Sequence, residues 1–381
     1  MSKENLHQQK IGVLGGGQLG RMLSLAASNL GLHLHFLDAA MDYPVGLVSS
    51  KLTVGNFRSK EDVMSFGKDL DVLTIEIENV NTEALFELEK SGTKVFPQPK
   101  IIELIKDKGS QKKFYEDQHL PTSEFKLFNS SKAIKEEIDL LKLEMPFVQK
   151  LRTEGYDGKG VLVVNDASEL DRLFDSPSLI EKKVDIKKEL AVIVARNESG
   201  EIKTYPTVDM VFDQEANLVD YLQTPAAIPE EINQKCQSIA LELAQKLDLI
   251  GLLAIEFFWT QTGEVLINEM APRTHNSGHI TMNTAVTSQF EQHLRSILNL
   301  PLGNTENLRS GIMLNLLGEK DYTGPAKYSY LNSLLEIPGV HLHIYGKKIS
   351  KPKRKMGHIN IVGEDLEKLK ETLERVKKLV P

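Results

Sequence analysis

The sequence has a single cysteine, Cys236, among 381 residues. One cysteine excludes an internal disulfide framework and any zinc site built from several thiolates. Such sparse use is typical of proteins from a reducing compartment. We expect Cys236 to pack in a core as a small apolar side chain.

The chain also lacks a basic excess and long apolar runs. Its 53 aspartates and glutamates outnumber 46 lysines and arginines, which gives a formal net charge of -7. Domains that bind a nucleic-acid backbone usually carry a basic surplus. No apolar run approaches the roughly 18 residues of a membrane span, and the first residues show no apolar signal core. We therefore expect a cytoplasmic protein that binds neither nucleic acid nor membranes, although local charge clusters still allow small anionic substrates.

The length suffices for roughly two to three domains. The first hundred residues alternate strand-like and helical segments, in the order IGVLGGG, a helix to Leu30, LHLHFLDA, DVLTIEIENV and TKVFPQP. This rhythm predicts an α/β unit with a parallel sheet between helices. We place it at 1–105, followed by a second unit at 106–300 and a small mixed unit at 301–381.

The later segments predict further elements. Helices are expected at 101–119, at 231–247 and in SQFEQHLRSILNL, and strands in MPFVQK, LIEKKV, KELAVIVARN, GIMLNLLG and HLHIYGKKI. A terminal amphipathic helix is indicated by Leu366, Leu369, Leu373 and Val376. The three glycines of RTEGYDGKG predict a mobile loop between strands.

Two glutamates thirteen positions apart, Glu256 and Glu269, flank a hairpin signal in AIEFFWTQTGEVLINEM. Thr262-Gly263 fits a two-residue hairpin loop, and counting outward from it pairs the two glutamates. Opposed residues share a face with Cβ atoms roughly 4.5–5.5 Å apart, where like charges are destabilising. We therefore expect a cation between them, and Mg²⁺ shared with nucleotide phosphates fits best. The alternative is a longer turn that leaves both acids at the solvent border.

Gly15, Gly17 and Gly20 form a G-x-G-x-x-G motif after the first strand, and Asp38 closes the next strand. Alone, this fingerprint predicts a nicotinamide dinucleotide site. Nothing downstream supplies a dehydrogenase site, however, and the same turn offers backbone N–H groups to any phosphate. We therefore favour a metal-bound nucleoside triphosphate elsewhere in the chain.

Lys150 ends a predicted strand just before the loop GYDGKG, from which its ammonium group can reach phosphates. A solvated lysine beside a flexible loop is the alternative, and Lys159 has the same ambiguity. Tyr156 and Asp157 are flanked by glycines, which is typical of a lid that carries substrate contacts.

The segment APRTHNSGH after Glu269 holds five polar side chains in seven positions: Arg273, His275, Asn276, Ser277 and His279. Such density beside a metal pair indicates a substrate site more than a surface loop. The planar fork of Arg273 suits a carboxylate-like or phosphate-like group. His275 is suited to hold a reacting oxygen or a proton.

A basic run between Lys347 and Lys355 precedes Gly357-His358 and the strand-like INIV. Such a run is either a solvated charged loop or an ordered loop that folds back to bind a substrate phosphate.

Taken together, these residues resemble the ATP-grasp ligases and, within them, the N5-carboxyaminoimidazole ribonucleotide synthases of purine biosynthesis. The resemblance runs through GGGQLGRML, EIENV, PFVQKLRTEGYDGKG, KKELAVIVARN, NEMAPRTHNSGH, TSQFEQHL and RKMGH, in that order. The stretch from Asn268 to His279 is the most specific part, and the glycine fingerprint is the least.

The resemblance implies an ATP-grasp fold with an N-terminal Rossmann-like domain and a small C-terminal mixed domain, assembled as a homodimer. It implies an ATP- and Mg²⁺-dependent enzyme that makes carboxyphosphate from bicarbonate. The amino group of 5-aminoimidazole ribonucleotide then captures the carboxyl group. The sister formate-dependent enzyme, which formylates glycinamide ribonucleotide, is the nearest alternative, and a silent nucleotide-binding regulator is another.

The family's site residues carry over to matching positions here. For ATP these are Lys108, Lys150, Gly155, Tyr156, Asp157, Gly158, Lys159, Gly160, Val161, Glu181, Lys182, Lys183, Val184, Glu189, Phe212, Asn268 and Glu269. For the aminoimidazole nucleotide they are Gln18, Leu19, Glu78, Tyr156, Asp157, Asn276, Ser277, Lys347 and Arg354. Glu256 and Glu269 would hold Mg²⁺. Arg273, His275 and Asp157 would serve catalysis.

Three positions depart from the family pattern or from simple strand geometry. Lys108 stands where the family usually has an arginine, which removes a bidentate fork. Phe212 stands where a histidine is usual. Strand alternation puts Asn268 on the face opposite Glu269, so a role in ATP binding requires a local twist or a backbone contact.

Overall fold

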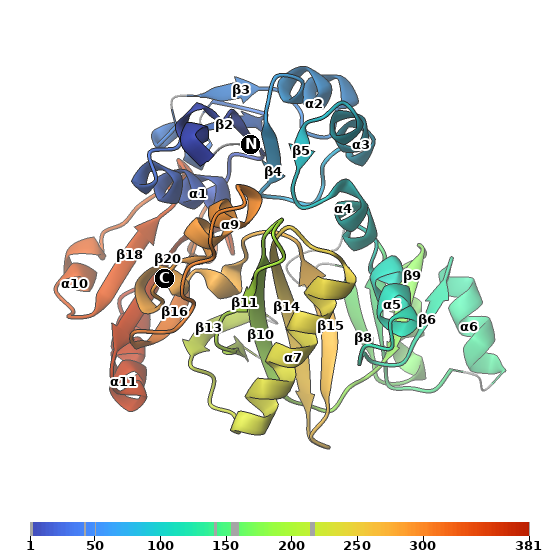
Figure 1. Ribbon diagram of the computed structural model, residues 1–381. Helices are drawn as coiled ribbons and strands as arrows, with labels where there is room; N and C mark the ends of the chain where they lie inside the picture. The colour runs from blue at the N-terminus through green and yellow to red at the C-terminus, as the bar shows by residue number, and fades with distance from the viewer. Residues whose placement is uncertain are drawn as a thin grey trace.

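The computed structural model describes residues 3–41, 43–49, 51–140, 143–153, 160–213 and 218–380. Three sheets carry the architecture (Figure 1). The N-terminal sheet lies at the top of the view, the largest sheet lies below it, and a small sheet lies to one side. The α/β class predicted from the sequence is confirmed.

The N-terminal sheet is parallel, with strand order β3-β2-β1-β4-β5. Its strands are β1 (Ile11–Leu14), β2 (Leu34–Asp38), β3 (Leu52–Val54), β4 (Val72–Ile75) and β5 (Lys94–Val95). The main helices between them are α1 (Gln18–Asn29), α2 (Lys60–Gly67) and α3 (Thr82–Lys90). Every residue of β1 and β4 is buried, as expected for central strands covered on both faces.

The small sheet is antiparallel, with strand order β6-β9-β7-β8. It contains β6 (Phe125–Phe128), β7 (Phe147–Leu151), β8 (Val161–Val164) and β9 (Ser178–Lys182), with α6 (Ser131–Asp139) packed beside it. β7 and β9 correspond to strands predicted from MPFVQK and LIEKKV.

The largest sheet has the order β15-β14-β10-β12-β13-β16-β20-β18, with β11 paired to β10. Its strands are β10 (Ile186–Arg196), β11 (Ile202–Thr204), β12 (Val208–Asp213), β13 (Leu218–Thr224), β14 (Gly251–Thr260), β15 (Val265–Ala271), β16 (Ser310–Leu317), β18 (Val340–Ile344) and β20 (Lys355–Gly363). β16 pairs with β13, so the sheet continues across residue 301. The division at 105/106 and 300/301 remains our proposal for domain boundaries.

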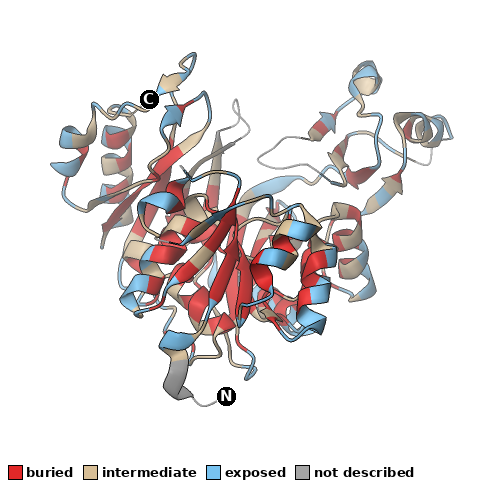
Figure 2. Cartoon of the chain, turned by 90° about the horizontal axis from the view of Figure 1, so that it is seen from above, coloured by how far each residue is buried: buried red, intermediate tan, exposed pale blue. Residues whose placement is uncertain are grey.

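Helices cover this sheet on both sides. α7 (Glu230–Lys246) packs on one face against Leu190, Val192 and Val194 of β10, and Cys236 is fully buried there, as predicted. α8 (Thr281–Thr284) and α9 (Gln289–Ile297) follow β15, while α10 (Leu331–Leu335) and α11 (Leu366–Lys377) belong to the C-terminal part. The buried strands run through the middle of the molecule and the exposed residues lie on its outer helices (Figure 2).

One predicted helix is in fact two. The expected helix at 101–119 divides into α4 (Pro99–Ile105) and α5 (Lys108–Asp117). The break falls at Asp107, whose carboxylate caps α5 by accepting hydrogen bonds from Gly109 N (2.7 Å) and Ser110 N (3.1 Å). Lys108 consequently stands at the first position of a helix. No helix in the described ranges is long and apolar enough to cross a membrane.

Candidate active site

Glu256 and Glu269 are paired across β14 and β15, as predicted, but the loop length and the strand register differ from the prediction. Thr260 N donates to Glu264 O at 2.9 Å, so the hairpin loop has three residues, 261–263, and the expected two-residue loop is wrong. Phe257 then pairs with Ile267, which leaves Asn268 as the extra residue of a β-bulge. The longer loop and the bulge compensate each other, and the two glutamates meet.

The bulge also decides the direction of Asn268. Lys150 Nζ donates to Asn268 Oδ1 at 2.8 Å, and Asn268 Nδ2 lies 3.5 Å from Glu256 Oε2. Asn268 therefore points to the same side as Glu256, and the prediction of the opposite face is wrong. Strict alternation fails here because a bulge inserts one residue into one strand only.

The carboxylates of this site lie close enough together that one ionised group disfavours the ionisation of its neighbour. Burial, then the neighbouring Glu269 and Glu189, raises the pKa of Glu256 to about 8. Burial alone would also raise the pKa of Glu269, but the ammonium group of Lys108, bonded to it, brings that pKa below its usual range. Burial raises the pKa of Glu189 to about 7. A cation placed between Glu256 and Glu269 would relieve this repulsion.

The donor set fits Mg²⁺ better than a metal caged by protein alone. Among the described residues no group of three or more histidine, cysteine, aspartate or glutamate side chains is placed to hold a metal ion. Mg²⁺ commonly binds one or two carboxylates and takes its other ligands from water and substrate phosphates. The pair Glu256 and Glu269 meets that requirement.

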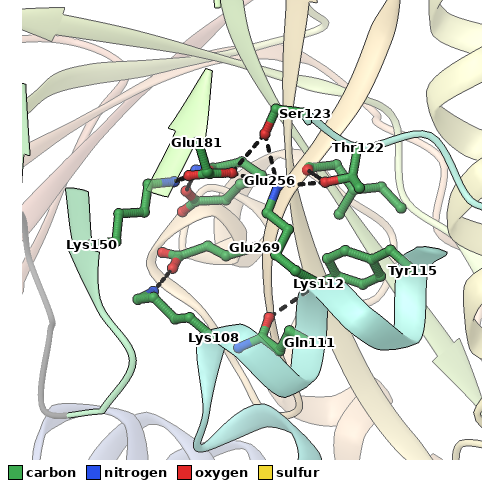
Figure 3. A network of polar contacts seen from close by, with 12 residues as sticks. Lys108, Gln111, Lys112, Tyr115, Thr122, Ser123, Lys150, Glu181, Glu256 and Glu269 are labelled. Atoms are coloured by element: carbon green, nitrogen blue, oxygen red, sulfur yellow. Dashed lines mark hydrogen bonds and ion pairs between the residues drawn. The ribbon is translucent and has the colours of Figure 1, made fainter. Parts of the chain in front are cut away.

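Helix α5 lines the site with one face (Figure 3). Lys108 bonds Glu269, and Gln111 Oε1 accepts from Met270 N at 3.3 Å and from Tyr115 Oη at 3.1 Å. Lys112 is on the same face. Of these residues only Lys108 was predicted from the sequence, although the spacing 108, 111, 112 and 115 indicates one face of a helix.

Glu181 is buried and lies between two lysines (Figure 3). Its Oε1 lies 2.5 Å from Lys112 Nζ and accepts from Ser123 Oγ at 2.6 Å, and its Oε2 lies 2.5 Å from Lys150 Nζ. Burial opposes ionisation, but Lys150 and Lys112 together lower the pKa of Glu181 to about 2. Glu181 is therefore ionised at neutral pH. Burial lowers the pKa of Lys112.

The predicted substrate segment reaches Glu256 of the glutamate pair and also the N-terminal domain. Arg273 Nη2 lies 2.8 Å from Glu78 Oε1, which joins residues 195 positions apart, and His275 Nε2 lies 3.7 Å from Glu256 Oε1. Arg273 Nε and Asn276 Oδ1 are buried and have no hydrogen-bond partner among the described residues. A spare donor and a spare acceptor are what a bound polar substrate requires.

Gln289 of α9 fixes the backbone of His275, and sequence reasoning did not identify it. Its Oε1 accepts from His275 N at 2.9 Å and its Nε2 donates to His275 O at 2.7 Å. His275 Nδ1 is 2.9 Å from Ser277 Oγ, so Nε2 is the nitrogen that faces Glu256.

His279 has a different environment from the rest of this segment. It is buried and stacks on His358, with ring centroids 4.7 Å apart, and His358 stacks on His343 at 4.4 Å. Burial holds the pKa of His279 well below its usual value. We therefore place His279 in the packing between the substrate segment and the C-terminal strands.

The backbone N–H groups of the glycine fingerprint bond carboxylates of the protein itself. Gly17 N and Gly20 N both donate to the carboxylate of Glu76, and Gly16 N donates to Asp38 Oδ2 at 2.6 Å. Asp38 thus bonds backbone, which argues against the nicotinamide alternative. Burial raises the pKa of Glu76 to about 7, although both backbone N–H groups oppose that rise. Gln18 and Leu19 open α1 between these two donors.

The remaining predicted residues fall into three groups. Gly155, Tyr156, Asp157, Gly158 and Lys159 lie outside the described residues. Gly160, with φ +75°, and Val161 lead into β8, Lys182 and Lys183 follow Glu181 at the end of β9, Val184 lies between β9 and β10, and Phe212 is on β12. Lys347 Nζ donates to Lys355 O at 2.7 Å and Arg354 Nη1 donates to Ile349 O at 2.5 Å, so both are held within the basic segment.

Three protein-family models match the chain. The ribonucleotide synthetase preATP-grasp domain matches residues 8–106, the ATP-grasp domain matches 113–290, and the phosphoribosylaminoimidazole carboxylase C-terminal domain matches 311–372. Their order is that expected from the sequence motifs.

Curated relatives cover nearly the whole chain. The N5-carboxyaminoimidazole ribonucleotide synthase of Bacillus subtilis is 34% identical over 368 residues, covering 95% of this chain and 94% of the relative. The phosphoribosylaminoimidazole carboxylase of Ogataea methanolica is 37% identical over 373 residues, covering 95% of this chain and 68% of the relative. The chain thus spans about two thirds of that longer protein.

Solved structures share the fold. The N5-carboxyaminoimidazole ribonucleotide synthetase of Thermotoga maritima superposes with a TM-score of 0.90 at 40% identity, covering 98% of both chains. The enzyme of Aspergillus clavatus, solved with ADP and 5-aminoimidazole ribonucleotide, has a TM-score of 0.89 at 32% identity and covers 97% of this chain and 98% of its own.

Proposed function

This chain belongs to the N5-carboxyaminoimidazole ribonucleotide synthase family of ATP-grasp enzymes, and we propose that it joins bicarbonate to 5-aminoimidazole ribonucleotide with ATP. The observation that carries the proposal is the meeting of Glu256, Glu269, Lys108, Lys150 and His275 at one place. Phosphoryl transfer needs chiefly positioning and charge neutralisation, and this set supplies both.

Glu256 and Glu269 would hold Mg²⁺, which when bound neutralises charge on the phosphates of ATP. Lys108 and Lys150 are our candidates to bind those phosphates, because each ends in an ammonium group beside the glutamate pair. In the structure these groups bond Glu269 and Glu181, so both must turn toward the phosphates as ATP binds. Glu181 to Val184, Glu189, Phe212 and Asn268 complete the proposed nucleotide site.

The proposed chemistry has two steps. An oxygen of bicarbonate attacks the γ-phosphorus, the bond to the bridging oxygen breaks, and ADP leaves carboxyphosphate behind. The exocyclic nitrogen of the aminoimidazole then forms a bond to the carboxyl carbon, phosphate departs and the nitrogen loses a proton. Arg273, whose Nε has no hydrogen-bond partner among the described residues, would orient the anion, and His275 Nε2 would hold the reacting oxygen or the proton.

The nucleotide substrate is expected to span the N-terminal domain and the substrate segment. Gln18 and Leu19 would approach its phosphate, Lys347 and Arg354 would add charge, and Glu78, Asn276 and Ser277 would contact its ring or ribose. Tyr156 and Asp157 belong to the loop expected to cover the site, and Asp157 is our candidate to orient the reacting amine. We also infer a cytoplasmic homodimer, which mass measurement in solution can test.

The test measures ADP release from ATP with Mg²⁺ and bicarbonate, with and without 5-aminoimidazole ribonucleotide. Strong dependence on that nucleotide is the expected result. ADP release that instead requires formate and glycinamide ribonucleotide would contradict the proposal and assign the formylating reaction.

A further inference from the structure

Among the described residues beside the proposed ATP site, Lys112 is the most deeply buried cation, and no step of the proposed reaction uses it. It is 2% exposed, on the α5 face that also presents Lys108. A lysine is rarely buried without a partner that requires its charge, because removing an ammonium group from water is costly.

Three oxygen atoms surround the Lys112 ammonium group (Figure 3). Glu181 Oε1 and Thr122 Oγ1 each lie 2.5 Å from Lys112 Nζ, and Ser123 Oγ lies at 2.9 Å. The three N–H donors of the group thus each have an acceptor, so its position is fixed.

These contacts orient the Glu181 carboxylate. Oε1 is held by Lys112 and Ser123, which leaves Oε2 to face Lys150 at 2.5 Å. Lys150 is 13% exposed in its side chain and reaches the solvent side of the site, whereas Lys112 does not. Lys112 therefore acts on the site through Glu181.

The charge count of this group matters for a phosphate. One carboxylate and two ammonium groups leave one net positive charge, and Lys150 is the less buried of the two lysines. Without Lys112, Lys150 and Glu181 would form a neutral pair, and Lys150 would have to leave an otherwise unpaired buried carboxylate to reach a phosphate. Uncompensated buried charge is strongly unfavourable, so that movement would be opposed.

We propose that Lys112 is a positioning residue for ATP, which neutralises and orients Glu181 so that Lys150 is free to bind the nucleotide phosphates. The proposal rests on the proposed function, because it assigns Lys150 to those phosphates. Helix α5 then positions two carboxylates of the site, because Lys108 bonds Glu269 and Lys112 bonds Glu181.

A second contact ties the same lysine to the strand that carries the metal pair. Thr122 Oγ1, bonded by Lys112, donates to Ile267 O at 2.8 Å, and Ile267 N donates to Pro121 O at 2.8 Å. Ile267 precedes Asn268, the bulge residue whose Oδ1 accepts from Lys150. Lys112 thus supports both acceptors of Lys150, Glu181 directly and Asn268 through the backbone of β15.

The experiment measures the dissociation constant of Mg²⁺·ATP by calorimetry, without bicarbonate or aminoimidazole nucleotide, on folded variants. Lys112→Met keeps the methylene stem and removes the charge, and we expect the constant to rise about tenfold or more, a change of about 1.4 kcal/mol. Lys112→Met/Glu181→Gln restores one net positive charge, and we expect the constant to return to within about threefold of wild type.

Lys188→Met is the matched control. Lys188 bonds the buried Asp209, and it lies on the face of β10 opposite Glu189. The Lys188→Met variant should have a lower melting temperature than wild type, and its dissociation constant for Mg²⁺·ATP should change by less than twofold. An unchanged constant in folded Lys112→Met would make Lys112 purely structural and overturn the proposal.

Glu181→Gln provides an independent test if Lys112→Met does not fold. It removes the carboxylate that Lys150 must leave and keeps both ammonium groups, so we expect the dissociation constant of Mg²⁺·ATP to equal that of wild type or to fall below it. A constant more than threefold above that of wild type in folded Glu181→Gln would overturn the proposal. If the wild-type protein binds Mg²⁺·ATP but carboxylates nothing, only the proposed function is contradicted. The dissociation constants of the variants would still test the role of Lys112.

Discussion

Two regions of this chain direct N–H donors at a carboxylate of the protein itself. In the N-terminal domain the donors are backbone groups of Gly17 and Gly20, and the acceptor is Glu76. In the ATP-grasp part the donors are the ammonium groups of Lys108 and Lys150, and the acceptors are Glu269 and Glu181.

The difference lies in what can move. Backbone donors at the start of a helix are fixed, so an external phosphate can reach them only if Glu76 turns away. Lysine side chains rotate, so the second region can exchange a carboxylate for a phosphate without rearranging its backbone. In this chain the glycine fingerprint alone therefore does not identify a phosphate site, because its backbone donors already bond Glu76. The lysines that can rotate are the better candidates to bind a phosphate.

The largest effect should come from removing one of the carboxylates that we propose as metal ligands in the ATP-grasp part. Glu269→Gln should reduce ADP release on the order of 10²–10³-fold, since charge neutralisation at the phosphates is worth several kcal/mol. Glu264→Gln, on the exposed tip of the same hairpin, is the control and should retain activity. Near-normal turnover in Glu269→Gln would remove the metal role.

His275→Ala should separate nucleotide binding from carboxylation. ATP affinity should stay within a few-fold, whereas formation of the carboxylated product should fall about 10²-fold, the lower end for general acid–base groups. Product is measured by incorporation of labelled bicarbonate. The exposed His341→Ala serves as the control, and an unchanged product rate in His275→Ala would count against the assignment.

In the N-terminal domain, the titration of Glu76 should make the free energy of unfolding depend on pH. Glu76 has a folded-state pKa of about 7, above the value of about 4.3 expected in the unfolded chain. The folded state therefore binds this proton more tightly, and the free energy of unfolding should fall as pH rises from about 4.3 to about 7.

Glu76→Gln should remove that part of the pH dependence, as measured by urea unfolding midpoints at pH 5 and pH 8. Some slope should persist, because Glu189 and Glu256 also have raised pKa values. Glu83→Gln, at an exposed position of α3, should keep the full wild-type slope. A slope unchanged in Glu76→Gln would show that Glu76 titrates normally.

The smallest effect is expected at Lys108. Lys108→Arg introduces a planar fork and should tighten ATP binding by about two- to fivefold, because bidentate contacts to phosphate are stronger than a point charge. Calorimetry with Mg²⁺·ATP measures the change. Weaker binding would show that the local space around Glu269 is fitted to lysine.

Much of the site was predictable from local patterns. The alternation of strands and helices predicted the parallel N-terminal sheet, and the hairpin signal predicted that Glu256 faces Glu269. The dense polar run after Glu269 predicted a substrate site beside that pair, and His275 of this run lies 3.7 Å from Glu256. These predictions depend on neighbours in sequence, whose geometry the backbone restricts strongly.

The sequence by itself determined the fold class and the family, because strand alternation and motif order are written along the chain. It also predicted the pairing of the two glutamates, but that pairing depends on a three-residue loop and a bulge that the turn residues did not predict. Only the tertiary structure decided that a bulge turns Asn268 toward Glu256, that Glu76 closes the glycine loop, and that Lys112 neutralises Glu181. These features join residues far apart in sequence, and a buried charge acquires its partner only when separate elements pack together.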